Sequence, residues 1–124
     1  MDRAPAKRSQ TTPSDFADEP FCKITAIVRT VALENVEQHL KTINVPGISV
    51  TKMKGYGEYK NFFRHDWVIE YARIEIFLQR KRADEVVRTI VDAAQTGQPG
   101  DGLVAILPVE SLYRIRSGEK VQAQ

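Results

Sequence analysis

The chain has 124 residues and a net charge of +2, from 18 Lys and Arg against 16 Asp and Glu. So small an excess gives no electrostatic argument for a nucleic acid or a membrane surface as a partner. The length suits one domain, and 42% hydrophobic with 27% charged residues is ordinary for a soluble globular protein. Cys22 is the single cysteine, which excludes an internal disulfide, and no apolar run approaches the ~18 residues of a membrane helix. The N-terminus lacks the hydrophobic core of a signal peptide, so we expect a cytoplasmic protein.

Residues 1–20 differ in composition from the rest of the chain. They hold three of the 6 prolines, several Ser and Thr, and Phe16 as the one large apolar residue after Met1. Such a segment cannot bury enough surface to offset its loss of conformational entropy. We therefore predict a disordered tail at 1–20, a folded domain at 21–120 and a short C-terminal tail at 121–124. A docking segment for a partner is the alternative interpretation of residues 1–20.

The hydrophobic periodicity of the domain predicts four strands and two helices. In chain order they are a strand at 22–29, a helix at about 33–43, a strand from 48 that ends at Gly55, a loop at 58–66, a strand from 67 to 78, a helix at 81–95 and a strand at 103–107. This order is that of a ferredoxin-like α+β fold, βαββαβ, with both helices on one face of an antiparallel sheet. The other face would carry Ile27, Tyr71 and Phe77, so we expect another subunit to cover it.

A Gly-rich segment, Thr96–Gly102, joins the second helix to the last strand. Its three glycines in seven residues, with Pro99 and Asp101, cannot form a regular element. Such a loop can hold an anion, most often a phosphate, on exposed backbone N–H groups. The simpler interpretation is a turn after a helix, with Gly97 as the left-handed residue that ends the helix.

Other features favour binding over catalysis. Arg114 and Arg116 alternate in a segment that we predict to be extended, so both guanidinium groups lie on one side and suit phosphate contacts. Gly57, close to the end of the second strand, marks a further place where backbone can approach a ligand. His39 and His65 have no partners at the spacing of a metal site. We therefore expect neither a metal nor an enzyme.

These motifs, in this order, resemble the PII signal-transduction family over residues 22–118. The segments that carry the resemblance are Lys23–Arg29, Pro46–Thr51, Lys54–Gly57, Arg73–Ile76, Thr96–Gly102 and Arg114–Glu119. Members of this family are trimeric ferredoxin-like proteins that sense nucleotides and small anionic metabolites. The resemblance therefore implies a PII-like homotrimer with nucleotide sites in the clefts between subunits.

The resemblance also implies roles for particular residues. Those assigned to nucleotide binding are Gly47, Ser49, Gly57, Glu75, Thr96, Gly97, Gly100, Asp101, Gly102, Arg114 and Arg116. Among them the Gly-rich loop holds phosphates, the two arginines reach in from a neighbouring subunit, and Gly47, Ser49 and Glu75 lie around the adenine and ribose. The segment Gly55–Trp67 corresponds to a mobile loop that reports ligand state to a partner protein. Its residues assigned to a second ligand or to the partner are Gly55, Tyr56, Glu58, Tyr59 and Lys60.

The chain departs from the family pattern at several ligand positions. Glu58 and Tyr59 stand where typical members have Arg and Gln, and Leu103 replaces a phosphate-binding Lys. Glu70 and Tyr71 stand in place of the basic residue that grips 2-oxoglutarate. Each charge-assisted contact is worth on the order of 1.5–3 kcal/mol, so these changes weaken the selectivity for a third phosphate. We predict ADP or AMP as the main nucleotide, weaker binding of ATP, and no response to 2-oxoglutarate.

The loop is also shorter than usual and lacks the Tyr-Arg-Gly-x-Glu-Tyr segment, so we expect no uridylylation. Divergent members with such changes include proteins tied to inorganic carbon transport and fixation. By this analogy we expect bicarbonate as a second ligand, and a bicarbonate transporter or a carbon-fixation component as the partner.

Two alternatives keep the same fold: a nitrogen-type regulator that responds to ATP and 2-oxoglutarate, and a structural or metal-tolerance trimer. An RNA-binding module would need exposed aromatic residues in an RNP pattern, which neither Lys23–Val28 nor Arg73–Ile76 supplies. We therefore expect no nucleic acid partner.

Overall fold

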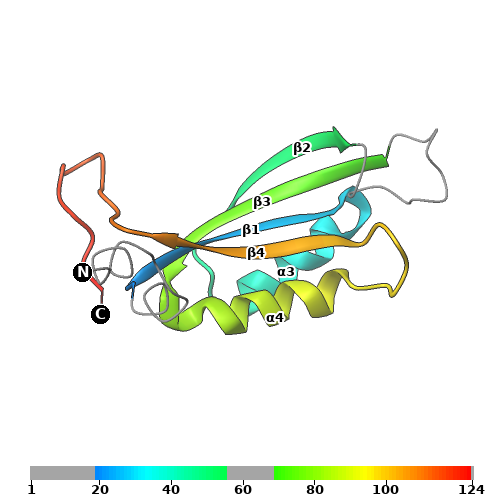
Figure 1. The fold of residues 1–124 in the computed structure, drawn as a ribbon, viewed down its shortest axis with the longest axis horizontal. Coiled ribbons are helices and arrows are strands. Elements are labelled where there is room, and N and C mark those ends of the chain that lie inside the picture. Colours follow the sequence, from blue (N-terminus) through cyan, green and yellow to red (C-terminus); the bar gives the residue numbers. More distant parts are fainter. Residues whose placement is uncertain (1–18, 56–68, 124) are drawn as a thin grey trace, which may run out of the picture.

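The computed structural model describes residues 19–55 and 69–123. Most of the predicted N-terminal tail and the whole of the predicted loop at 58–66 lie outside these residues. With the labels of Figure 1, the elements are β1 (Phe21–Arg29), the 3-10 turn η1 (Thr30–Ala32), α3 (Leu33–Thr42), β2 (Ser49–Gly55), β3 (Ile69–Gln79), the 3-10 turn η3 (Arg80–Arg82), α4 (Ala83–Ala94) and β4 (Gly102–Val109).

The four strands form one sheet in the order β2-β3-β1-β4, and every neighbouring pair is antiparallel. Both helices lie on the same side of this sheet (Figure 1). This arrangement confirms the predicted ferredoxin-like α+β fold. In this order β3 and β1 are the central strands, and β2 and β4 form the edges.

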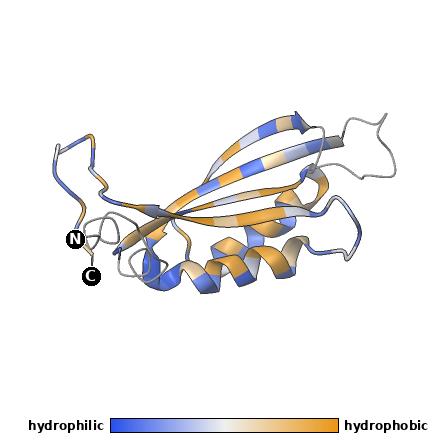
Figure 2. Ribbon diagram, viewed as in Figure 1, coloured by the Kyte–Doolittle hydropathy of each residue, from blue (hydrophilic) through white to orange (hydrophobic). Residues whose placement is uncertain are grey.

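The core lies between the sheet and the helices. Ile24 on β1 is paired in register with Ile76 on β3 and with Ile106 on β4, and both Ile24 and Ile76 are buried. The helices contribute Val36, Leu40, Val86 and Ile90, each buried. Figure 2 shows the alternation of hydrophobic and hydrophilic residues along α4 that this packing requires. Burial of each such side chain is worth about 1.5–3 kcal/mol.

The face of the sheet opposite the helices carries apolar residues, of which some are buried and others are exposed. Ile27 and Tyr71 are 6% and 0% exposed in the single chain, so neither needs another subunit to cover it. Phe77 is 57% exposed and Leu107 is 42% exposed, and both flank Lys23 in the same cross-strand row. Ile27 and Tyr71 are therefore already covered within the chain, contrary to our expectation for them, and coverage of the exposed Phe77 by another subunit stays a prediction.

The segment after β4 is a turn rather than the extended strand that we predicted. The N–H of Gly118 donates to the carbonyl of Arg114 at 2.7 Å, and the N–H of Arg114 donates to the carbonyl of Glu119 at 2.9 Å. Gly118 has a φ of +72°, a conformation that allows the chain to reverse here. Arg114 and Arg116 therefore do not share one side of an extended strand. No helix among the described residues has the length and apolar character needed to cross a membrane.

Candidate functional site

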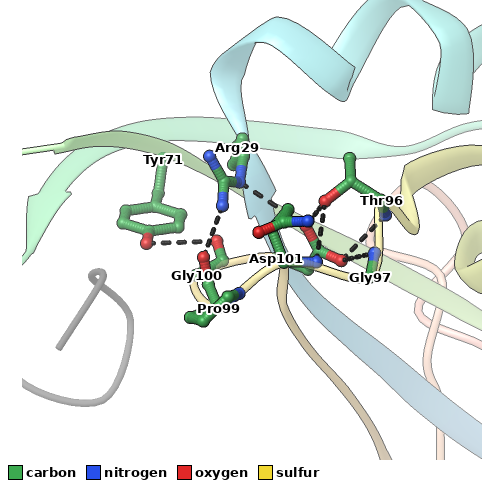
Figure 3. A network of polar contacts seen from close by, with 8 residues as sticks. Arg29, Tyr71, Thr96, Gly97, Pro99, Gly100 and Asp101 are labelled. Atoms are coloured by element: carbon green, nitrogen blue, oxygen red, sulfur yellow. Dashed lines mark hydrogen bonds and ion pairs between the residues drawn. The ribbon is translucent and has the colours of Figure 1, made fainter. Parts of the chain in front are cut away.

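The Gly-rich loop Thr96–Gly102 leaves the end of α4 and returns to the sheet at β4, beside the ends of β1 and β3 (Figure 3). Its glycines Gly97, Gly100 and Gly102 have φ values of +84°, +93° and +108°. A residue with a side chain adopts this left-handed region only with strain, which explains why glycine recurs here. The loop has the irregular shape expected from its sequence.

Asp101 holds the loop together from inside. Its carboxylate accepts hydrogen bonds from the backbone N–H of Thr96 at 2.8 Å and of Gly97 at 2.9 Å. The hydroxyl of Thr96 donates to the other carboxylate oxygen and accepts a hydrogen bond from the N–H of Gln98 at 3.2 Å. Two of the donors that the sequence offered to an outside anion are thus already used by an anion of the chain itself.

The charge state of Asp101 follows from this setting. Partial burial alone would raise the pKa of its carboxyl, but three hydrogen bonds from Thr96 and Gly97 and the nearby guanidinium of Arg29 together lower the pKa. The side chain is therefore a carboxylate at neutral pH, which the N–H donors require.

Two side chains from the central strands hold the far part of the loop, and neither role was predicted from the sequence. The guanidinium of Arg29 donates to the carbonyl of Pro99 at 2.6 Å, and its Nε lies 3.6 Å from the carboxylate of Asp101. The hydroxyl of Tyr71 donates to the carbonyl of Gly100 at 3.3 Å. Figure 3 shows both side chains reaching the loop from the sheet. Arg29 stands at the end of a strand pattern, and no local signal indicates a contact with a loop 70 residues away.

Gly102 is where the loop meets β1 most closely. A Cβ atom placed on Gly102 would lie 1.8 Å from the carbonyl oxygen of Ile27, whereas one on Gly97 would meet no atom within 4 Å. Next to this contact is a hollow of about 350 Å³, lined mainly by apolar residues of α4, β1 and β4, together with Gln95 and Asp101. A volume of this size is at the lower end of those that take a small ligand.

The other predicted site residues form separate groups in the single chain. Ser49 on β2 and Glu75 on β3 are direct cross-strand partners, and Glu75 also pairs with Lys23 at 2.6 Å. That hydrogen bond from Lys23 lowers the pKa of Glu75. Glu75 is four residues along β3 from Tyr71, a backbone separation of about 13 Å. Gly47 is an exposed residue just before β2, and a Cβ atom placed on it would meet no atom within 4 Å.

The remaining candidates lie at the two ends of the sheet. Gly55 ends β2 in register with Ile69 of β3. This is the end of the sheet at which Tyr71 contacts the Gly-rich loop. Arg114 and Arg116 line a shallow hollow with the exposed Phe77. The predicted loop residues Tyr56, Gly57, Glu58, Tyr59 and Lys60 lie outside the described residues.

A metal site finds no support in the part of the chain that the structure describes. Within residues 19–55 and 69–123, no three His, Cys, Asp or Glu side chains are close enough to hold a metal ion. His39 is instead bonded through Nδ1 to the carbonyl of Asn35, one turn earlier on α3. His65 lies outside the described residues.

Comparison of the sequence with known proteins finds one family, both as a family model and as individual relatives. The family model described as nitrogen regulatory protein P-II matches residues 21–119. Nitrogen regulatory protein P-II of Cyanidium caldarium is 36% identical over 107 residues, which cover 81% of this chain and 95% of that protein. The P-II homolog of Arabidopsis thaliana is 29% identical over 124 residues, and the match spans 94% of this chain but 63% of the plant protein.

A solved structure shows the same fold. The crystal structure of Arabidopsis thaliana PII bound to citrate superimposes with a TM-score of 0.73 at 32% sequence identity. The superposition covers 85% of this chain and 92% of the plant chain.

Proposed function

The chain belongs to the P-II family of nitrogen regulatory proteins, which are signal-transduction regulators, and we propose that it is a non-enzymatic regulator that binds an adenine nucleotide. The observation that carries this proposal is the loop Thr96–Gly102, whose shape is held by Asp101 and by three glycines with positive φ. Because the backbone of this loop is already held in one conformation, binding of an anion costs little further conformational entropy. The apolar hollow beside it suits the flat base of a nucleotide.

We propose that ADP or AMP binds more tightly than ATP. Leu103, which directly follows the loop on β4, is an apolar side chain that is 39% exposed and pairs in register with Ile27 of β1. It offers no positive charge at the place where the family resemblance leads one to expect a lysine. A third phosphate would add negative charge without this cation, at a loss of about 1.5–3 kcal/mol for the missing contact.

We propose that the complete site forms in a homotrimer. In the single chain, Glu75 and its partner Ser49 lie about 13 Å along the sheet from Tyr71, the residue that reaches the loop, so the candidate residues form separate groups. Arg114 and Arg116, on the turn after β4, are exposed, as a contribution to a neighbouring copy requires. The exposed Phe77 and Leu107 supply apolar surface for such an assembly.

We also propose a second, anionic ligand and a partner protein, both addressed through the segment Gly55–Trp67. By analogy with carbon-linked members of the family, the ligand is bicarbonate and the partner is a cytoplasmic carbon-fixation component or a bicarbonate transporter. The Arabidopsis structure contains citrate, which makes small carboxylates the natural comparison in any test. The names of the relatives favour one alternative, a nitrogen-type regulator that responds to ATP and 2-oxoglutarate.

Calorimetric titration of the full chain tests these proposals. AMP, ADP and ATP are each titrated alone, with bicarbonate, with citrate and with 2-oxoglutarate, and Asp101→Asn serves as the variant whose loop is loosened. We expect ADP or AMP to bind best, more tightly with bicarbonate, and to bind the variant less tightly. Tight ATP binding that 2-oxoglutarate strengthens would establish the nitrogen-type alternative instead. Absence of nucleotide binding would contradict the proposal and would favour the simpler interpretation of the loop as a turn after a helix.

A further inference from the structure

Two consecutive carbonyl groups of the loop are held by side chains from the two central strands. Arg29 of β1 donates to the carbonyl of Pro99 at 2.6 Å, and Tyr71 of β3 donates to the carbonyl of Gly100 at 3.3 Å. Arg29 and Tyr71 are direct partners in the register of β1 and β3, so their side chains leave the sheet on the same face. Figure 3 shows the two contacts side by side.

These two contacts fix the direction of two N–H groups. The chain has no cis peptide bond among the described residues, so each carbonyl points opposite to the N–H of the same peptide plane. The carbonyl of Pro99 belongs to the plane of the Gly100 N–H, and the carbonyl of Gly100 belongs to the plane of the Asp101 N–H. With both carbonyls turned toward Arg29 and Tyr71, both N–H groups face away from the sheet. Successive N–H groups on one side of a turn form a concave site for an anion.

The N–H groups of Gly100 and Asp101 are separate from those of Thr96 and Gly97, which bind the Asp101 carboxylate. The carboxylate of Asp101 uses the N–H groups of Thr96 and Gly97, and it does not use those of Gly100 and Asp101. Arg29 joins the two parts, because its Nε also lies 3.6 Å from Asp101. Tyr71 donates to the Gly100 carbonyl through a neutral hydroxyl, so its replacement by phenylalanine removes that hydrogen bond without changing the charge beside the loop.

Tyr71 is well suited to hold a fixed direction. Its side chain is 0% exposed, so the surrounding packing, the loop included, restricts its position. Burial raises the pKa of the hydroxyl, and Asp101 adds to this increase although Arg29 opposes it. The hydroxyl therefore keeps the proton that it donates throughout the neutral range.

We propose that Arg29 and Tyr71 are positioning residues for phosphate binding: by holding the carbonyls of Pro99 and Gly100, they aim the N–H groups of Gly100 and Asp101 at the ligand. The inference rests on the proposed nucleotide function, and it adds to it two residues that do not themselves touch the nucleotide. It assigns Tyr71 a role in the nucleotide site, although Tyr71 stands at a position that in the family resemblance belongs to the site for 2-oxoglutarate.

The first test measures direction without any ligand. Residual dipolar couplings report the orientation of each backbone N–H bond, and they are recorded for the ligand-free full chain and for Tyr71→Phe. We expect the couplings of Gly100 and Asp101 to change while those of Thr96 and Gly97 stay the same. If the couplings of Gly100 and Asp101 stay as in the wild type, Tyr71 does not orient them and the proposal is overturned.

The second test measures the consequence for binding. ADP and adenosine, which lacks phosphate, are titrated into the wild type, Tyr71→Phe, Arg29→Met and the control Arg88→Met, whose exposed side chain lies on α4 near Asp92. Loss of the neutral Tyr71 contact should weaken ADP binding by about three- to tenfold, and loss of the charged Arg29 contact by more than about tenfold. Adenosine binding should stay the same in all four proteins, and ADP binding should stay the same in Arg88→Met.

The outcomes separate this inference from the proposed function. Equal losses for ADP and adenosine would mean that the two residues only support the fold, which overturns their positioning role. A wild type that binds no ADP would overturn the nucleotide function and the phosphate part of the inference together. Changed couplings in Tyr71→Phe would in that case still support its orienting contact with the loop.

Discussion

Gly97 and Gly102 have similar backbone angles but very different surroundings. Both have positive φ, which costs a residue with a side chain about 1–2 kcal/mol. A Cβ on Gly102 would in addition lie 1.8 Å from the carbonyl oxygen of Ile27, a backbone atom that cannot move without parting β1 from β4. Open space surrounds the equivalent position on Gly97. The same substitution should therefore have different effects at the two sites.

We predict that Gly102→Ala lowers the free energy of unfolding by on the order of 3 kcal/mol or more, and Gly97→Ala by about 1 kcal/mol. Gly47→Ala is the matched control, because Gly47 has ordinary φ and open space, and its effect should be close to zero. Urea denaturation of the three variants measures these differences. Equal losses at Gly97 and Gly102 would show that backbone strain alone, and not the contact with Ile27, decides the cost.

Asp101 makes the stability of the loop depend on pH. Its pKa is lowered in the folded chain, so its ionised form stabilises the fold above the unfolded value of about 4, and this contribution disappears as the pH falls through the folded value. We predict that Asp101→Asn loses about 1–3 kcal/mol of unfolding free energy at neutral pH. The difference from the wild type should shrink as the pH falls from neutral through the unfolded value of about 4 and then through the lower folded value, because a protonated carboxyl is uncharged like the amide. A difference that stays constant between these pH values would contradict the assignment.

At the scale of elements, Arg82 connects the two helices. It lies in η3, before α4, and its guanidinium donates to the carbonyls of Ile43 at 2.5 Å and Asn44 at 3.2 Å, just after α3. Both carbonyls lie beyond the last residue of α3, where no N–H of the helix reaches them, and the guanidinium gives them a partner. Asn44 has a φ of +62°, so the chain reverses immediately after this contact.

We predict that Arg82→Met destabilises the fold by about 1–2 kcal/mol, because the substitution keeps the apolar stem and removes the donors. Arg88→Met is the control: Arg88 is exposed on α4, 3.8 Å from Asp92, and a surface pair of this kind contributes about 0–0.5 kcal/mol. Thermal and urea denaturation measure both changes. A loss at Arg82 no larger than at Arg88 would show that water satisfies the end of α3 equally well.

Periodic elements could be predicted from the sequence and contacts between distant residues could not. The alternation of Ile24, Ala26 and Val28 predicted β1, because successive side chains of a strand point to opposite faces and every second residue faces the core. The same alternation of Arg114 and Arg116 failed, because the bond from Gly118 to Arg114 closes a turn that a period of two cannot reveal.

The candidate site shows the same limit. Its glycines could be found from composition, since only glycine tolerates their backbone angles. The inward use of Asp101 and the contacts of Arg29 and Tyr71 depend on where α4, β1 and β3 end in space. Such contacts leave no local pattern.

At the scale of the molecule, one row of side chains on the face opposite the helices combines apolar surface with a charge. Lys23 on β1 lies between Phe77 of β3 and Leu107 of β4, with its ammonium 5.8 Å from the centre of the Phe77 ring. Phe77 and Leu107 are 57% and 42% exposed, while Ile76, the neighbour of Phe77 on β3 that faces the helices, is buried. Covering such side chains is worth about 1.5–3 kcal/mol for each one fully buried. A second copy of the chain is the occupant that we propose for this face.

Replacement of Phe77 by lysine therefore tests the trimer directly. Phe77→Lys should leave the single domain folded, because the side chain is already more than half exposed, but association would bury a new cation beside Lys23. In sedimentation equilibrium we expect a mass three times that of the chain for the wild type and the mass of one chain for Phe77→Lys. Val31→Lys, at an 89% exposed position on η1, should leave the assembly unchanged. If Phe77→Lys keeps the wild-type mass, the subunits meet elsewhere, and the nucleotide site must be completed by a different pairing of Arg114 and Arg116 with the loop.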